Sequence, residues 1–177
     1  CGPDWEVQLD EPDGYSLGDL AGVGNDRVAY ATRAGFAVLD TADGTIRWRA
    51  RTDIANPGLA VADDLIVAAN RRDRLAVFPA DGCGAPTCPP RWEAAPMDGP
   101  NTLGTGPVVA DGVVYYAALS TVYAYALHGC GAPTCPPLAA VDVGARIRGG
   151  PLIDGGRVHV ATHGDAVGHL VTLDTPT

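Results

Sequence analysis

Short runs of apolar residues, separated by turn residues, recur along the whole chain. In residues 106–115 an apolar run, an Asp-Gly turn and a second apolar run follow one another. This pattern predicts a β-hairpin, because Asp-Gly readily adopts the backbone conformation of a two-residue turn. The same pattern occurs at residues 20–30, where the turn falls at Asn25-Asp26, and at residues 58–67 and 150–159.

A third apolar run follows each hairpin, and a fourth follows a further turn. The third runs lie at residues 36–39, 75–78, 122–127 and 170–173, and the fourth runs lie at residues 45–48, 91–94 and 138–141. The last copy ends after its third run, whereas the opening Trp5-Glu6-Val7 aligns with Trp92-Glu93-Ala94. We therefore expect the N-terminal strand to complete the last copy, which would remove two free sheet edges.

The copies recur with a period of about 44 to 48 residues. Residues 82–90, Gly-Cys-Gly-Ala-Pro-Thr-Cys-Pro-Pro, recur unchanged at residues 129–137, which is 47 residues later. Four short antiparallel strands per copy at such a period are typical of a propeller blade. The sequence predicts an all-β protein, in which residues 1–177 form a single β-propeller domain of about four four-stranded antiparallel blades.

Composition narrows the class of protein further. The 177 residues include 23 Gly and 15 Pro, which a bundle of long helices does not tolerate. The net charge of −9 argues against a nucleic-acid partner. The chain has no Lys and therefore no P-loop, no G-x-S-x-G nucleophile motif, and no apolar run long enough to span a bilayer.

Residues 38–48, Val-Leu-Asp-Thr-Ala-Asp-Gly-Thr-Ile-Arg-Trp, carry a resemblance to a known family. The stretch resembles the blade motif of the pyrroloquinoline-quinone-like, or quinoprotein-like, β-propellers. The paired-cysteine turn is similar to a variant in secreted or lipoprotein-type bacterial members. The resemblance implies that Trp5, Trp48 and Trp92 dock between neighbouring blades. The third full copy has Ala139 at this position.

The resemblance also raises the question of a quinone cofactor. In active dehydrogenases of this family the quinone lies between a Trp and a disulfide of two adjacent cysteines, beside a metal held by Glu, Asn and Asp. This chain has no Cys-Cys pair and about four blades instead of seven or eight. We therefore expect no cofactor.

We expect no metal site either. The acidic turn residues recur once per blade, which favours capping of turns, and no calcium-binding Asp series is present. His159, His163 and His169 are interpreted as solvent-facing turn residues.

Four of the five cysteines form two closely spaced pairs, Cys83 with Cys88 and Cys130 with Cys135. Each pair flanks a short Pro-containing loop, which favours two disulfides and hence an oxidising compartment, meaning the periplasm, the cell surface or the medium. The alternative is a zinc site of four thiolates, although the two pairs belong to different blades.

Cys1 has two interpretations. It aligns with Cys88 and Cys135, so it is the second cysteine of a truncated turn. Alternatively, it is the lipid-attachment residue of a mature lipoprotein, in which Gly2 is a common following residue. Several acyl chains hold a lipoprotein firmly, whereas a single chain anchors weakly.

These observations predict a non-enzymatic, extracytoplasmic propeller that is a protein-docking or structural module of the cell envelope. Its partner is an unidentified protein, and the membrane is reached only through a lipid anchor at Cys1. The resemblance is compatible with assistance in outer-membrane protein assembly or with a sensor domain, because function depends on sites rather than folds. The run Arg71, Arg72 and Arg74 is a solvated turn or a rim contact for an acidic partner.

Two alternatives remain open. The chain is part of a larger quinoprotein-like oxidoreductase, or it is half of a self-assembled eight-bladed ring, a homo-oligomer.

Overall fold

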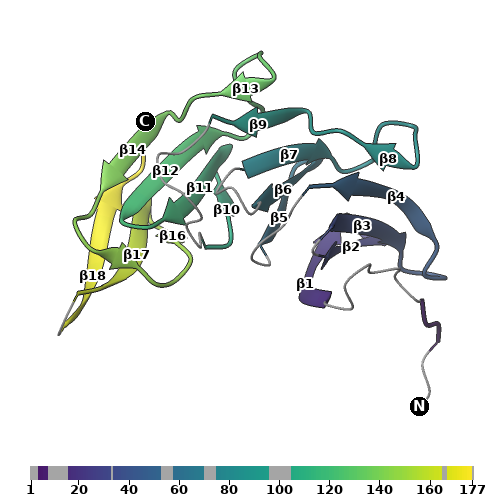
Figure 1. Ribbon diagram of the computed structural model, residues 1–177, viewed down its shortest axis with the longest axis horizontal. Coiled ribbons are helices and arrows are strands. Elements are labelled where there is room, and N and C mark those ends of the chain that lie inside the picture. The colour runs from purple at the N-terminus through teal and green to yellow at the C-terminus, as the bar shows by residue number, and fades with distance from the viewer. Residues whose placement is uncertain are drawn as a thin grey trace.

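The computed structural model describes residues 4–7, 16–32, 34–52, 58–69, 75–95, 105–164 and 167–176. In this part of the chain all regular structure is β, in four sheets. None of these residues lies in a helix that is long and apolar enough to cross a membrane. Figure 1 shows the sheets side by side along an arc, in the order of the sequence. We refer to them as the first, second, third and last blades.

The first two blades each contain four antiparallel strands. The first blade has the order β1(Ser16–Val23), β2(Arg27–Thr32), β3(Gly35–Asp40) and β4(Ile46–Arg51). The second blade has the order β5(Leu59–Ala62), β6(Leu65–Ala69), β7(Leu75–Pro79) and β9(Trp92–Ala94). The first strand of each blade lies at the inner side of the arc and the fourth lies at the outer side (Figure 1).

The third blade repeats this order, and the last blade differs from it. The third blade contains β10(Val108–Ala110), β11(Val113–Ala118), β12(Thr121–Ala126) and β14(Ala139–Asp142). The last blade contains β16(Leu152–Asp154), β17(Arg157–His163) and β18(Gly168–Asp174), and β15(Arg146–Ile147) pairs with the far end of β17. The four antiparallel sheets confirm the predicted propeller fold.

The expected position of the N-terminal strand is wrong within one chain. Residues 4–7 form no strand, and Trp5 contacts the first blade instead of the last. Residues 4–7 and β18 lie at opposite ends of the arc (Figure 1). The physical reason is geometric, because the four blades form an open arc and its two ends do not meet.

Two short strands have no counterpart in the sequence prediction. β8(Thr87–Cys88) pairs in parallel with β4 of the first blade, and β13(Thr134–Cys135) pairs in parallel with β9 of the second. Each belongs by sequence to the loop before the fourth strand of the following blade. The cysteine motif therefore adds a fifth strand to the preceding sheet, which a simple turn would not do.

The core lies between the blades. Two clusters of thirteen buried residues each fill the first and second seams, whereas the described part of the third seam contains seven. Alternate residues of the middle strands point to opposite seams. Ile66 and Ala68 pack toward the first blade, while Leu65 and Val67 pack toward the third. The middle strands are therefore buried on both faces, and their sequences are continuous apolar runs.

Candidate docking surface

Two tryptophans join successive blades. Trp48 of β4 donates its indole N–H to the carbonyl of Ala80 in the second blade at 3.2 Å. Trp92 of β9 makes the same contact with Leu127 in the third blade at 3.0 Å. Both indoles are about 2–3% exposed. Trp48 also contacts Phe36 and Phe78, so three aromatic rings cluster in the first seam.

A glycine with positive φ lies beneath each of these indoles. A methyl group added at Gly82 would lie 2.9 Å from ring carbons of Trp48, and one added at Gly129 would lie 2.8 Å from Trp92. The glycines have φ of +76° and +80°, a region that other residues rarely adopt. These positions require glycine both for the turn and for the close approach of the ring.

Trp5 occupies the equivalent place on the first blade. Its indole N–H donates to the carbonyl of Thr41 at 2.9 Å, and its ring lies against Gly44. The resemblance therefore pointed to three tryptophans that the structure places at blade surfaces. The third seam has Ala139 at the corresponding position, and Tyr115 is the largest buried side chain among its described residues.

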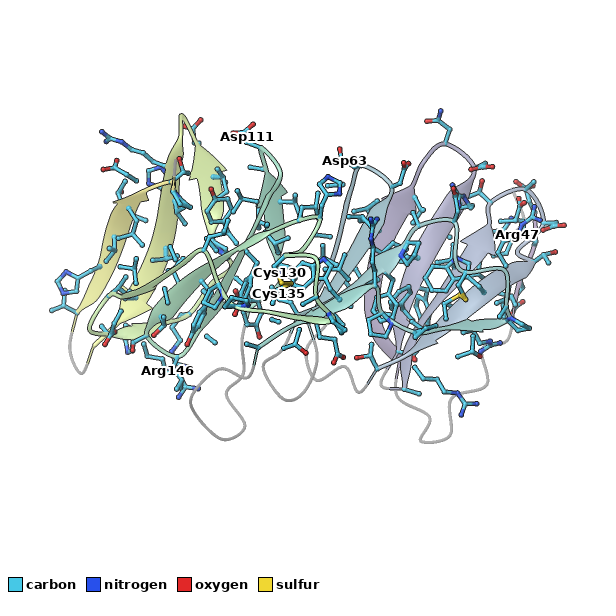
Figure 2. The ribbon with its side chains drawn as sticks, turned by 90° about the horizontal axis from the view of Figure 1, so that it is seen from above. Arg47, Asp63, Asp111, Cys130, Cys135 and Arg146 are labelled. Atoms are coloured by element: carbon cyan, nitrogen blue, oxygen red, sulfur yellow. A yellow bond between two sulfur atoms is a disulfide. The ribbon has the colours of Figure 1, made fainter. Side chains whose placement is uncertain are left out.

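The cysteine loops bridge neighbouring blades at the outer side of the arc. Cys83 forms a disulfide with Cys88, and Cys130 forms one with Cys135, each with a Cα–Cα separation of 5.6 Å. The thiolate zinc alternative is therefore wrong, because each pair is already bonded within its own loop. Figure 2 shows Cys130 and Cys135 on the outer surface, midway between the two ends of the blades.

Each cysteine loop also makes backbone hydrogen bonds to the preceding blade. The N–H of Arg49 in β4 donates to the carbonyl of Pro86 at 2.9 Å. The N–H of Glu93 in β9 donates to the carbonyl of Pro133 at the same distance. The disulfides thus hold loops that connect one blade to the next.

The turns of the blades define two ends of the arc. In antiparallel sheets the first-to-second and third-to-fourth turns lie at the same end. We call it the hairpin end, formed by residues 24–26, 41–45, 63–64, 80–82, 111–112, 127–129, 155–156 and 174–176. In Figure 2, Asp63 and Asp111 lie at this end and Arg146 lies at the opposite one.

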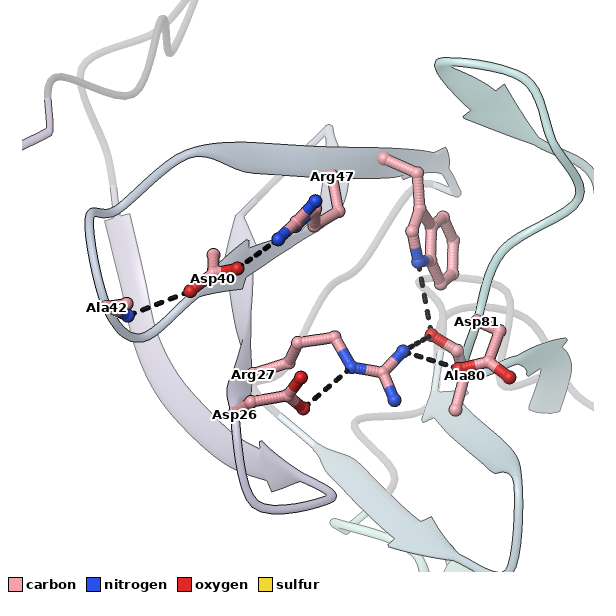
Figure 3. A network of polar contacts seen from close by, with 8 residues as sticks. Asp26, Arg27, Asp40, Ala42, Arg47, Ala80 and Asp81 are labelled. Carbon is pink, nitrogen blue, oxygen red and sulfur yellow. Dashed lines mark hydrogen bonds and ion pairs between the residues drawn. The ribbon is translucent and has the colours of Figure 1, made fainter.

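Polar side-chain contacts cross two of the seams at the hairpin end. The guanidinium of Arg27 reaches from the first blade to the carboxylate of Asp81 in the second at 2.6 Å, and it also donates to the carbonyl of Ala80 (Figure 3). The hydrogen bond that Arg27 donates to Asp81 is the largest cause of the raised pKa of Arg27. In the next seam, His128 of the third blade lies 3.3 Å from Asp63 of the second.

A second polar pair lies on the turn of the first blade. The guanidinium of Arg47 contacts the carboxylate of Asp40, which also accepts the N–H of Ala42 at 2.8 Å (Figure 3). These two hydrogen bonds, that of Arg47 first, lower the pKa of Asp40 below its ordinary value. Nearby, Arg47, Trp48 and the loop from Asp81 to Pro86 line an open groove of about 390 Å³.

Three histidines lie on the last blade. His159 and His163 belong to β17 and His169 belongs to β18, so their assignment to turns is wrong. The imidazole of His159 lies 2.9 Å from the hydroxyl of Thr172. Within the described ranges, no group of three or more His, Cys, Asp and Glu side chains is arranged to hold a metal ion.

Several sequence predictions fall on residues that the structure does not describe. Cys1, the candidate lipid-attachment residue, and the run Arg71, Arg72 and Arg74 lie outside the described residues. The contacts that sequence reasoning missed are the parallel strands β8 and β13, the ion pair of Arg27 with Asp81, and the contact of His128 with Asp63. The Arg27 contact has no sequence signal, because Asp81 is 54 residues away.

Four antiparallel sheets along an arc, with an indole at two of the three seams, define the chain as a β-propeller repeat protein. No family model and no curated protein matches its sequence. Solved structures with this fold include BamB from Moraxella catarrhalis, the computationally designed Ika4 protein and the WD40 domain of coronin from Toxoplasma gondii.

The similarity to these structures extends over most of the chain. BamB is 14% identical with a TM-score of 0.63, over 82% of this chain and 40% of BamB. Ika4 is 13% identical with a TM-score of 0.70, over 99% of this chain and 100% of Ika4. The coronin domain is 13% identical with a TM-score of 0.63, over 90% of this chain and 43% of the other. The chain thus spans about two fifths of BamB and all of Ika4, and at these identities the likeness shows the fold alone.

Proposed function

We propose that the chain is a non-enzymatic, extracytoplasmic β-propeller of the quinoprotein-like type that docks a protein partner at its hairpin end. The observation that carries the proposal is the rigid arrangement of this end. Arg27 with Asp81 and His128 with Asp63 connect turns of successive blades, so turns far apart in sequence form one surface. Fixed loops on a rigid scaffold are suited to binding, because little entropy is lost on association.

The charge of this surface indicates the chemistry of the partner. Side chains of several aspartates there are largely exposed, at 74% for Asp26, 78% for Asp81, 61% for Asp63 and 92% for Asp174. The whole chain has a net charge of −9. A partner with a basic patch would be steered to this end, and raising the ionic strength would slow its association.

The extracytoplasmic location is supported by the two disulfides, since such bonds persist in oxidising compartments. Cys1 is the residue that would carry a lipid anchor. Labelling of free thiols in protein isolated without reductant tests the location, and mass spectrometry of the N-terminal peptide tests the lipid. Four labelled cysteines within residues 83–135 would contradict an oxidising compartment.

A photo-crosslinking amino acid at position 64 tests the docking surface, with position 146 at the opposite end as the matched control. Asp64 and Arg146 are both exposed. In the native cell envelope we expect crosslinks to a partner from position 64 that weaken as salt is added, and none from position 146. Equal crosslinking from both positions, or from position 146 alone, would reject the hairpin end as the docking surface.

The absence of enzymatic quinone chemistry is a separate part of the proposal. It rests on the lack of adjacent cysteines in the sequence. Adding pyrroloquinoline quinone and calcium to the protein should leave tryptophan fluorescence unquenched. Stoichiometric quenching at low micromolar quinone would favour the oxidoreductase alternative instead.

A further inference from the structure

Within the part of the chain that the structure describes, the edge of β18 that faces away from β17 is unpaired. Among the described residues β18 pairs only with β17, whereas β4, β9 and β14 cover the corresponding edge in the other blades. The N–H of Thr175, just after β18, donates to the carbonyl of Gly156, just before β17. Because bonded and non-bonded pairs alternate in an antiparallel ladder, the N–H groups of Leu170 and Thr172 point away from β17. Such an edge is a template for another strand.

Among its described residues, the last blade lacks a fourth strand beside β18. Residues 4–7 resemble a fourth strand in sequence, but they lie against the first blade, at the other end of the arc. Trp48 and Trp92 lie on the fourth strands of their own blades and contact the blade that follows. Trp5 makes the same contact with the first blade, through the carbonyl of Thr41 and the ring face over Gly44. Residues 4–7 therefore lie where the fourth strand of a blade preceding the first would lie.

In a single chain that preceding blade is absent from the described residues, because β18 lies at the far end of the arc (Figure 1). We propose that two copies of the chain associate head to tail. Residues 4–7 of each copy pair with the free edge of β18 in the other copy and complete its last blade as the fourth strand. Two such contacts related by a two-fold axis close the arcs into an eight-bladed ring.

The apolar surface at the two ends of the arc fits this contact. Val158 and Val160 pack toward the third blade, so the opposite face of the last blade points away from it. That face carries Leu152 and Leu170, which are 64% and 73% exposed. On the first blade, Leu20 is 62% exposed. Head-to-tail association would bring these leucines together and bury them between blades.

The charge pattern of the hairpin end continues across the proposed contact. Arg27 is the first residue after the hairpin turn of the first blade, and its side chain reaches Asp81 in the following blade. Arg157 holds the same position in the last blade. In the ring it would face the turn of the first blade in the second copy, where Asp43 precedes the glycine as Asp81 does. The present contact of Arg157 is a 3.8 Å ion pair to Asp174 within its own blade.

Sedimentation equilibrium of the purified chain from about 1 to 100 µM tests the proposal. The mass of one chain is 18.1 kDa, and we expect a single species of twice that mass. A monomer at every concentration would overturn the proposal, and so would an open series of larger oligomers, because a two-fold ring is closed. The measurement uses the protein alone, so failure here leaves the proposed docking of a partner untouched, and loss of partner crosslinking leaves the ring untouched.

Two variants locate the contact. Leu170→Pro removes an N–H that points to the free edge and leaves the β17–β18 ladder in place. Leu170→Val, which keeps the N–H and an apolar side chain, is its control. Trp5→Ala removes the docking of residues 4–7 without altering the last blade, and Trp5→Phe is its control. Leu170→Pro and Trp5→Ala should each raise the dimer dissociation constant at least about tenfold, as expected for a central interface group.

Circular dichroism separates dissociation from unfolding in these variants. Because Trp5→Ala changes no described strand, we expect native β-sheet content in the dissociated monomer. A dimer that survives both Leu170→Pro and Trp5→Ala would place the interface elsewhere and overturn the proposal.

Discussion

The indole N–H of Trp48 and the carbonyl of Ala80 meet across the seam between the first and second blades at 3.2 Å. The bond satisfies the one polar atom of a side chain that is otherwise surrounded by apolar groups. It also fixes the distance between an outer strand and the turn of the next blade. Trp92 and Leu127 repeat the relationship one blade further on. The spacing of the blades is therefore set by these contacts as well as by the aliphatic core.

Replacing Trp48 should strongly destabilise the fold. We expect Trp48→Ala to lower the free energy of unfolding by about 3–5 kcal/mol, because a large buried ring is lost and a cavity remains. Trp48→Phe keeps most of the packing and loses the hydrogen bond, so its cost should be smaller. Urea unfolding followed by circular dichroism measures both. Equal, small losses for the two variants would show that the indole does not hold the seam.

Alanine variants of two glycines distinguish the stability lost through the turn backbone from the stability lost through contact with Trp48. Gly82 and Gly84 have φ of +76° and +80°, but only Gly82 lies against Trp48. Gly84→Ala should cost about 1–2 kcal/mol for the left-handed backbone alone. Gly82→Ala should cost more, because its methyl group would lie 2.9 Å from the indole ring. Thermal unfolding of both variants checks the order, and a larger loss for Gly84→Ala would contradict it.

Removing one disulfide should have a modest effect on stability. The double variant Cys83→Ala with Cys88→Ala should lose about 2 kcal/mol, since a short loop gains little entropy when it is opened. The equivalent double variant at Cys130 and Cys135 is the matched comparison.

Hydrogen exchange should show which backbone amides lose protection when the Cys83–Cys88 disulfide is removed. The N–H of Arg49 donates to Pro86 of the first cysteine loop, so its protection should fall in the Cys83–Cys88 variant. The N–H of Glu93 should remain protected, because Pro133 belongs to the intact second loop. Loss of protection at both amides would indicate general unfolding instead of a local opening.

Asp40 should make stability depend on pH in the acidic range. Arg47 and the N–H of Ala42 lower the pKa of Asp40 in the folded state below the ordinary 3.8. A group with a lowered folded pKa stabilises the fold above its unfolded pKa, and this stabilisation is lost as the pH falls through the folded value. Asp40→Asn should therefore reduce the loss of stability as the pH falls below 5, and Asp154→Asn, at the exposed end of β16, is the control. An unchanged pH profile in Asp40→Asn would contradict the role of this carboxyl.

Sequence reasoning recovered the blades because their signal is local and repeated. The hairpin at residues 106–115 appears as β10 and β11, since an Asp-Gly turn between two apolar runs is specified by neighbouring residues. The docking of Trp48 was predicted from the resemblance of residues 38–48 to a known blade motif. The parallel pairing of β8 with β4 was not found, because Thr87 and Arg49 are far apart in sequence and a cysteine loop usually suggests only a turn.

The position of residues 4–7 could not be predicted from the alignment for a different reason. Their similarity to residues 91–94 predicted a fourth strand, whereas residues 4–7 form no strand and Trp5 alone makes the contact of the repeated tryptophans. Whether that segment meets its own last blade or another surface depends on the curvature that accumulates over several seams. No pattern within one repeat reports that curvature, and the third seam, with Ala139 in place of Trp, differs from the first two.

The parallel pairing of β8 with β4, and of β13 with β9, has a mechanical consequence. A pull that separates two blades along the direction of these strands loads their backbone hydrogen bonds in shear, so several must break together. The covalent ring of each cysteine loop prevents the short strand from peeling away by extension of its own loop. Tension applied along the outer circumference would therefore pass from blade to blade through main-chain bonds, and the apolar seams would bear less of the force.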